Sequence, residues 1–299
     1  MRKLGIVFIV LVIALAITAL PVFAITGNFV KDFEHPFVGL VVFYDEEGEF
    51  SHRCSGSLLT PTVFLTAGHC TEGVSSARVY FQQDAGANFD PETQLDPITG
   101  YPEFCAEGTL GVTCATSDEL YNFGFDNFAG FPNTKDVGLV ILDQPISLPE
   151  YGQLAAAGTL DPLATQRGRQ DVTFTVSGYG LTYSSPVSVV SFRERLMARA
   201  ELVNLRSANT AGFNLQTTAN PGGGKGGTCF GDSGGPVFYG DFSSNLIVGV
   251  TSFGFGFNRD VCAGVDFAFR TDQQAVIDWI LDTVPEDQAS LIQIIDIWD

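Results

Sequence analysis

Basic residues are scarce in this chain of 299 residues. Lys and Arg together number 15 against 34 Asp and Glu, which gives a net charge of −19 at pH 7. Losing Arg2 and Lys3 with an N-terminal leader would leave 13 basic residues and a charge of −21. So acidic a surface repels a phosphate backbone, and the composition therefore argues against nucleic acid as a partner.

Three other patterns are missing. No paired C-x-x-C spacing occurs, which argues against a zinc site built from the six cysteines. No Asn lies in an N-x-[ST] acceptor, so N-glycosylation is not expected. Beyond the first residues, no apolar run is long enough to cross a bilayer.

The first 24 residues have the three parts of a secretory signal. Met1-Arg2-Lys3 is positive, residues 4–19 are almost wholly apolar, and Ala24 ends a small-residue cleavage pattern. We predict a signal peptide over 1–24 and a secreted, extracellular protein with no membrane attachment after cleavage. An uncleaved anchor is the alternative, but the apolar run is short for a span of about twenty residues.

The stretch 226–236, GGTCFGDSGGP, places Ser233 among glycines. Residues without a Cβ let a substrate carbonyl approach both the hydroxyl and the neighbouring backbone N–H groups. The pattern G-x-S-x-G also marks the α/β-hydrolases, in which the catalytic His follows the Ser. Here His35, His52 and His69 all precede Ser233. That order excludes the hydrolase triad and leaves the order His, Asp, Ser.

Three motifs occur in that order: LTAGHC at 65–70, KDVGLVIL at 135–142 and the stretch 226–236. Together they resemble the trypsin/chymotrypsin-like serine proteases. Further matching segments are CSGSLL at 54–59, VSGYG at 176–180 and TSFG at 251–254. The resemblance spans nearly the whole mature chain. It implies an all-β fold of two six-stranded antiparallel β-barrels of the chymotrypsin type with a C-terminal helix, and a monomeric serine endopeptidase acting on polypeptides without a metal or organic cofactor.

The resemblance also assigns the chemistry. Serine is a poor nucleophile at neutral pH, so it needs a base and a third group that orients the base. We assign Ser233 as nucleophile, His69 as general base and Asp136 as the orienting carboxylate. The backbone N–H groups of Gly231 and Ser233 are the expected oxyanion hole. Peptide bonds would then be hydrolysed through an acyl-enzyme.

Cleavage after Ala24 would expose Ile25-Thr26-Gly27-Asn28, which is similar to the N-terminus that zymogens of this family reveal on activation. In those enzymes the new ammonium pairs with the aspartate before the nucleophile, here Asp232. A buried carboxylate needs such a partner. We hypothesise that signal removal itself completes the active enzyme; the alternative is that Ile25 stands there by chance.

The resemblance also implies a specificity pocket for the P1 residue, whose carbonyl is attacked. The expected substrate contacts are Gly227, Thr228, Ser252, Phe253, Gly254 and Val265. Gly227 stands where tryptic relatives carry an acid, so a Lys or Arg would enter unpaired and we predict an apolar P1 residue. Gly254 leaves the entrance open, and Val265 narrows the depth. Shifting the alignment of 267–269 by one residue would instead point Asp266 into the pocket and favour basic side chains.

The six cysteines fit the same pattern. The resemblance pairs Cys54 with Cys70 and Cys229 with Cys262, which leaves Cys105 and Cys114 as a local staple. An even number of cysteines, all accounted for, favours an oxidising compartment.

Short apolar or β-branched runs separated by Gly, Pro, Asp and Asn are typical of an all-β fold. We place the first barrel, with His69 and Asp136, in 25–148. The linker, the second barrel with Ser233 and the C-terminal helix occupy 149–299. Residues 84–133 are predicted to be an insertion, 272–284 a helix, and 288–298 a further amphipathic turn or helix.

A catalytically silent family member acting as a binding module is the alternative, because fold does not fix function. Silent members usually lack a triad residue or the glycine before Asp-Ser. This sequence lacks neither.

Overall fold

The computed structural model describes residues 25–298 apart from 86, 88, 91, 97–99, 103, 104, 106–113, 166–171, 182, 183, 186, 187, 190–192, 221, 258 and 259. The predicted signal peptide lies outside these residues. The strands of the N-terminal half are β1 Thr26–Gly27, β2 Phe29–Lys31, β3 Val38–Tyr44, β4 Phe50–Leu58, β5 Val63–Thr66, β6 Ser76–Tyr80, β7 Cys114–Ser117, β8 Glu119–Asn122 and β9 Gly138–Ile141.

The strands that follow are β10 Gln153–Ala155, β11 Thr173–Gly178, β12 Ser184–Ser185, β13 Ser188–Val189, β14 Leu196–Asn204, β15 Asn214–Ala219, β16 Gly226–Gly227, β17 Pro236–Tyr239, β18 Leu246–Phe257, β19 Asp260–Arg270 and β20 Ile294–Ile295. The helical segments are α2 Gly68–Thr71, η1 Asp161–Thr165, η2 Gly222–Gly224, α3 Gln274–Thr283 and α4 Glu286–Ala289.

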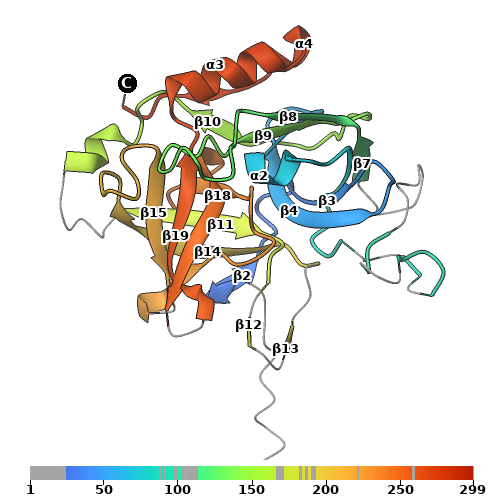
Figure 1. Ribbon diagram of the computed structural model, residues 1–299, viewed down its shortest axis with the longest axis horizontal. Coiled ribbons are helices and arrows are strands. Elements are labelled where there is room, and N and C mark those ends of the chain that lie inside the picture. Colours follow the sequence, from blue (N-terminus) through green and yellow to red (C-terminus); the bar gives the residue numbers. More distant parts are fainter. Residues whose placement is uncertain are drawn as a thin grey trace, which may run out of the picture.

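The first barrel is a closed ring of antiparallel strands, at the right of Figure 1. Strands β6, β3, β4, β5 and β9 pair in that order, while β7 pairs with β6 and β8 with β9. Only Asp118 separates β7 from β8, so these two act as one bent strand that closes a six-stranded ring. Residues 114–122 were expected inside an insertion; they are barrel wall, because their alternating side chains complete this core.

The second barrel is a ring of six strands as well. Strands β11, β14, β15, β19 and β18 pair in order, and β17 closes the ring by pairing with both β18 and β11. Strand β2 adds to β14, and the two barrels stand side by side in Figure 1. The two buried clusters, one based on each barrel, are rich in Val, Leu and Phe, as expected from the short apolar runs. The predicted fold class is therefore confirmed.

The C-terminal segment departs from the expected helical pattern. Helix α3 lies within the predicted 272–284, and Pro285 separates it from the single turn α4. Beyond α4 the chain extends, and β20 pairs in parallel with β10, which itself pairs in parallel with β18. The tail is thus an added edge strand, because backbone pairing with β10 outweighs a helix too short to be stable.

None of the helices in the described ranges has the length and apolar character needed to span a membrane.

Candidate active site

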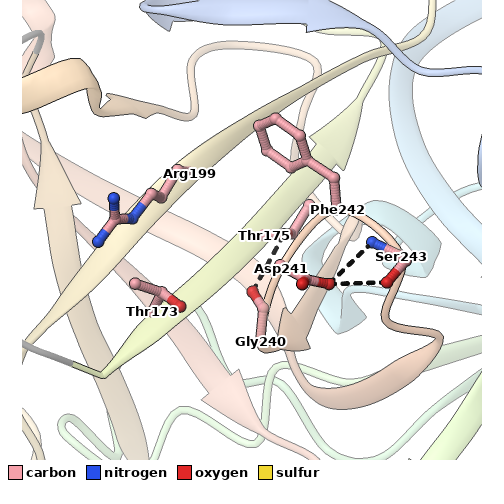
Figure 2. A pocket seen from close by; sticks show the side chains of 7 residues that line it. All are labelled: Thr173, Thr175, Arg199, Gly240, Asp241, Phe242 and Ser243. Atoms are coloured by element: carbon pink, nitrogen blue, oxygen red, sulfur yellow. Dashed lines mark hydrogen bonds between the residues drawn. The ribbon is translucent and has the colours of Figure 1, made fainter.

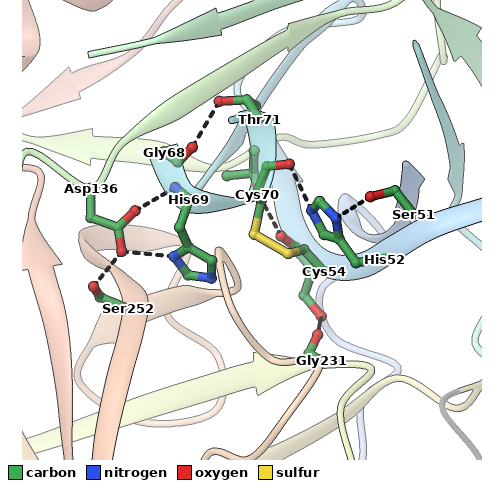
Figure 3. Close-up of a disulfide and its surroundings, with 12 residues drawn as sticks. Ser51, His52, Cys54, Gly68, His69, Cys70, Thr71, Asp136, Gly231 and Ser252 are labelled. Carbon is green, nitrogen blue, oxygen red and sulfur yellow. Dashed lines mark hydrogen bonds and ion pairs between the residues drawn. A yellow bond between two sulfur atoms is a disulfide. The ribbon is translucent and has the colours of Figure 1, made fainter. Parts of the chain in front are cut away.

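His69 and Asp136 form a hydrogen-bonded pair at the junction of the barrels. His69 lies on α2, directly after β5, and Asp136 lies two residues before β9. The His69 Nδ1 is 2.9 Å from Asp136 Oδ2, and the His69 backbone N–H donates to Oδ1 at 2.7 Å. Figure 3 shows Asp136 between His69 and Ser252, whose hydroxyl also donates to Oδ2. Three donors hold this buried carboxylate, so the imidazole ring is fixed in orientation.

Ser233 lies on the turn between β16 and β17. Gly231 and Gly234 have φ of 94° and 79°, which side chains with a Cβ rarely adopt. A Cβ on Gly234 would also lie 2.7 Å from the Ala67 nitrogen, two residues before His69. The Ser55 backbone N–H donates to the Ser233 carbonyl at 2.8 Å. Glycine thus permits the close approach that brings this turn beside the His69 segment.

Ser233 and His69 line one pocket of about 430 Å³. The other residues that line it are Thr228, Cys229, Phe230, Thr251, Ser252, Phe253, Gly254, Cys262 and Asp266. Within the described residues, no hydrogen bond joins Ser233 Oγ to His69 Nε2. Such contacts are often long without substrate and tighten in the complex. The structure thus places Ser233 and His69 at one cavity without a hydrogen bond between their side chains.

The N–H groups of Gly231 and Ser233, expected to form an anion-binding pair, have no hydrogen-bond partner in the described part of the chain. The Gly231 carbonyl is held instead by the Ser55 hydroxyl at 2.8 Å, and the Leu181 N–H donates to the Phe230 carbonyl at 2.7 Å. These contacts fix the turn while leaving both donors available.

Asp232 is fully buried, and its partners among the described residues are backbone donors. Gly180 N–H lies 2.8 Å from Oδ1 and Cys229 N–H lies 2.9 Å from Oδ2. Burial raises the pKa of Asp232 to about 7. The Ile25 side chain is also fully buried, and β1 pairs with β16, opposing Thr26 to Gly227. Because Ile25 follows Ala24 in this chain, its nitrogen is an amide, and the ion pair with Asp232 stays a prediction for the cleaved protein.

The structure favours the alternative register of the specificity pocket. Asp266 lines the pocket, its Oδ2 accepts the Thr228 N–H at 2.6 Å, and a Cβ on Gly227 would lie 2.8 Å from that oxygen. Val265, which we expected to narrow the pocket, is not among the residues that line it. Neighbouring residues of β19 point to opposite faces, and a one-residue shift exchanges one for the other. Burial, with the nearby charge of Asp232, raises the pKa of Asp266 to about 7.

Three disulfides connect the cysteines: Cys54 to Cys70, Cys105 to Cys114 and Cys229 to Cys262. The resemblance implied the first and third of these pairs, and the second joins the two cysteines that remained. The first tethers α2 and His69 to β4, and the third borders the pocket. The sulfurs of Cys54 and Cys70 also lie close enough to His69 to share a metal, but they are bonded to each other and are not available as thiolate ligands.

A separate cavity of about 520 Å³ lies on the second barrel, between β11, β14 and the loop 240–243 (Figure 2). Arg199 there pairs with Glu201 at 3.2 Å, and the Asp241 carboxylate accepts the Ser243 N–H and hydroxyl. Its charged groups already have partners, so it offers no reactive group.

Sequence reasoning missed two features of this site. It counted Ser252 only as a substrate contact, although the hydroxyl of Ser252 donates to Asp136. It also gave no role to Phe125, whose ring lies 5.9 Å from that of His69. The many Phe residues between 123 and 131 were the available signal.

Comparison with known proteins places this geometry in a family. The family model described as "Trypsin" matches residues 25–280. Human chymotrypsin-like elastase family member 3B is 29% identical over 250 residues, which cover 81% of this chain and 82% of that protein. Similarity to such relatives supports a peptidase function.

Solved structures agree on the fold. The HL collagenase structure has a TM-score of 0.59 at 18% identity and covers 86% of this chain and 96% of its own. An inactivated protease paralogue of the scabies mite has a TM-score of 0.56 at 16% identity and covers 86% and 95%. With a family match over most of its length and the same two-barrel fold, the chain belongs to the trypsin family of serine proteases.

Proposed function

We propose that this protein is a catalytically active, secreted serine endopeptidase. The observation that carries the proposal is that Ser233 lines one pocket with His69, which is hydrogen-bonded to Asp136, beside two N–H groups that have no partner among the described residues. Acyl transfer needs a nucleophile, an oriented base and donors for the developing oxyanion.

In this proposal the Ser233 hydroxyl attacks the scissile carbonyl as His69 Nε2 takes its proton. Asp136 keeps the other ring nitrogen protonated and stabilises the imidazolium that forms. The N–H groups of Gly231 and Ser233 receive the charge on the carbonyl oxygen. His69 then gives its proton to the leaving amine, and a water molecule, activated in the same way, hydrolyses the acyl-enzyme.

Activation would follow signal cleavage after Ala24. The new Ile25 ammonium would supply the cation that the buried Asp232 lacks. Ion pairing offsets the cost of burying that carboxylate and would fix the adjoining Gly231–Ser233 turn. Cleavage at this point also implies export, which suits the three disulfides. The division into barrels at 25–148 and 149–299 is proposed with it.

The pocket suggests the P1 preference. A carboxylate at Asp266 would pair with a Lys or Arg side chain when ionised and accept an uncharged side chain when protonated. We therefore replace the expectation of a purely apolar P1 residue with a preference for basic residues at neutral and higher pH.

The competing proposal is a silent binding module. The missing hydrogen bond between Ser233 and His69 favours it, and the fold is shared with an inactivated protease paralogue. A fluorophosphonate probe separates the two, because only an activated serine is labelled. We expect labelling of the mature protein and none of Ser233→Ala, with Ser243→Ala as a matched control that keeps its label. A correctly processed protein that takes no label would refute the proposal that this protein is an active enzyme.

A further inference from the structure

Ser55 is fully buried on β4 of the first barrel, yet several of its hydrogen bonds reach the second barrel. Its hydroxyl donates to the Gly231 carbonyl at 2.8 Å and accepts the Tyr179 N–H at 2.9 Å. Its backbone N–H donates to the Ser233 carbonyl at 2.8 Å. Figure 3 shows the Gly231 carbonyl beside Cys54, the residue before Ser55. One residue of the first barrel therefore holds the turn that carries the nucleophile at two points.

The direction of the Gly231 N–H depends on the two peptide planes that meet at Gly231. A trans peptide is planar, so its N–H points away from its carbonyl. The Leu181 N–H holds the Phe230 carbonyl at 2.7 Å and so fixes the plane that carries the Gly231 N–H. The Ser55 hydroxyl fixes the next plane through the Gly231 carbonyl. With both planes held, the φ of 94° at Gly231 is imposed from both sides.

Gly231 cannot keep this conformation by itself. Glycine has no Cβ and rotates freely between regions of φ that other residues avoid. A donor that is already aimed when charge develops on the substrate oxygen costs no reorganisation during the reaction, whereas a donor that turns away does not stabilise that charge. The bond from Ser55 to the Gly231 carbonyl therefore bears on the oxyanion, although Ser55 itself does not touch the substrate.

The same hydroxyl supports a second segment that holds the turn. Residues 179–181 follow β11, and the N–H groups of Gly180 and Leu181 both donate to the turn, to the Asp232 carboxylate at 2.8 Å and to the carbonyl before Gly231 at 2.7 Å. By accepting the Tyr179 N–H, the hydroxyl fixes the first residue of this segment. Loss of the hydroxyl would therefore loosen both supports of the turn.

Ser55 also connects the turn to the segment that carries the base. The hydroxyl of Thr66, three residues before His69, donates to the Ser55 carbonyl at 2.8 Å. Cys54, the neighbour of Ser55, forms a disulfide with Cys70, the neighbour of His69. Catalytic groups must be held within about 0.5 Å of their productive geometry. The base and the oxyanion donors are thus positioned from adjoining residues of one strand.

We propose that Ser55 is a positioning residue whose hydroxyl aims the Gly231 N–H at the oxyanion. This inference rests on the proposed function and goes beyond it, because it makes kcat depend on a residue outside the triad and the pocket. The Leu181 bond would survive the loss of the hydroxyl, so the effect should be smaller than the roughly 10²–10³-fold cost of a whole donor. We expect kcat to fall about 10-fold with little change in KM, since the contact matters only in the transition state.

The test compares Ser55→Ala with Ser57→Ala as the matched control. Ser57 lies two residues further along β4 and is equally buried, but its hydroxyl has no hydrogen-bond partner among the described residues. The control therefore removes the same atom without breaking a bond. We would measure kcat and KM for one peptide with Arg at P1, per active site counted with the fluorophosphonate probe. Ser55→Ala should show the fall in kcat, and Ser57→Ala should keep the kcat of the unchanged protein.

Ser55→Gly removes the same hydroxyl and provides a second protein if Ser55→Ala folds poorly. Its kcat should fall by the same factor as that of Ser55→Ala. Because active sites are counted, a loss of folded protein alone would leave kcat per site unchanged.

A peptidyl trifluoromethyl ketone measures the stabilisation of the oxyanion directly. The bond from Ser233 Oγ to the ketone carbon forms as the π electrons move to the oxygen, and the hydroxyl proton passes to His69. The pKa of the resulting oxygen, followed by ¹⁹F NMR, should rise by about 1 in Ser55→Ala, which is a 10-fold weaker hold on the anion. It should stay constant in Ser57→Ala. A purely structural role of Ser55 would not change this pKa.

Equal kcat in the Ser55 variants and the unchanged protein would overturn the role of Ser55 and leave the enzyme intact. A kcat that falls while the pKa of the bound ketone oxygen stays the same would overturn it as well, because Ser55 would then act elsewhere in the reaction. If the unchanged mature protein takes no label, the proposed function fails, and this inference fails with it.

Discussion

Two histidine–aspartate pairs in this molecule are built almost alike. His69 and His35 each place Nδ1 2.9 Å from a carboxylate oxygen, of Asp136 and Asp32 respectively. Each of these aspartates is buried and also accepts a serine hydroxyl, from Ser252 on Asp136 and from Ser177 on Asp32. The same three residue types therefore occur in the same hydrogen-bonded order twice.

The two pairs differ in the surroundings of the second ring nitrogen, Nε2. His35 is fully buried, its ring stacks on that of Phe238 at 4.3 Å, and its Nε2 lies 3.2 Å from the Ser244 carbonyl. The side chain of His69 is 26% exposed and lines the pocket. Both nitrogens of His35 lie against acceptors inside the protein, so neither is accessible to a substrate. A Ser–Asp–His order alone therefore indicates no activity; an accessible Nε2 does.

The largest expected effect comes from Asp136→Asn. The amide cannot hold the required tautomer of His69, so kcat should fall about 10⁴-fold. Peptide hydrolysis, normalised to folded protein, measures it. Asp126→Asn, an exposed neighbour in the same loop, should keep full activity. A fall of less than tenfold in Asp136→Asn would remove the contrast between the two pairs.

Asp32→Asn should have the opposite result. Breaking this buried pair should lower the free energy of unfolding by about 3–5 kcal/mol, while kcat per labelled active site stays nearly constant. Although burial alone would raise it, the hydrogen bond and charge of His35, together with Arg195, lower the pKa of Asp32 on folding.

The stabilisation from Asp32 is therefore complete above the usual carboxyl pKa and is lost as pH falls through the lowered value. Urea unfolding between pH 3 and 7 measures this loss. The free energy of unfolding of Asp32→Asn should fall less steeply at low pH than that of the unchanged protein. Equal stability of the two proteins at pH 7 would show that the pair is not a structural element.

A third test uses a protein that carries one extra residue before Ile25. If the Ile25 ammonium orders the turn at Gly231, the extended protein should lose about 10²–10³ in kcat, the usual cost of an oxyanion donor. Ile25→Val with the correct N-terminus should stay active. Equal activity of the extended protein would contradict the proposal.

The same extended protein has a distinct pH signature. The pKa of Asp232 is raised on folding to about 7, so its contribution favours folding below the ordinary carboxyl pKa and is lost as pH rises towards 7. The correctly cut protein should avoid this loss, and the difference in Tm between the two should widen from pH 5 to pH 8. A difference in Tm that stays constant with pH would show that Asp232 does not pair with the Ile25 ammonium.

The smallest effect concerns Asp266. Its pKa of about 7 predicts that the kcat/KM ratio for Arg over Leu at P1 rises about 10-fold from pH 6 to pH 8, since ionisation creates the charge that pairs with Arg. Assays at both pH values with two peptides measure the ratio. Asp266→Asn should make this ratio independent of pH. A ratio that falls as pH rises would contradict the pairing of Asp266 with a basic P1 side chain.

Local motifs predicted the two barrels and the residues around Ser233 because short patterns such as GDSGG are set by backbone needs within a few residues. The pocket was harder: Val265 and Asp266 are neighbours on one strand, and only the register of β19 decides which side chain faces inward. The pair Asp32–His35 could not be distinguished from a reactive pair, since the difference lies in Phe238 and Ser244, about 200 residues away. Strand β20 was missed because its pairing with β10 is non-local.

Both tryptophans of the chain lie near its C-terminus. Trp279 on α3 packs against Phe123 of the first barrel at 5.2 Å, and the Trp298 indole donates to the Thr159 carbonyl at 2.9 Å. Neither lines the pocket. Intrinsic fluorescence should therefore report whether α3 and the C-terminal tail are packed on the barrels. A ligand that binds in the pocket would have to be followed with an extrinsic dye.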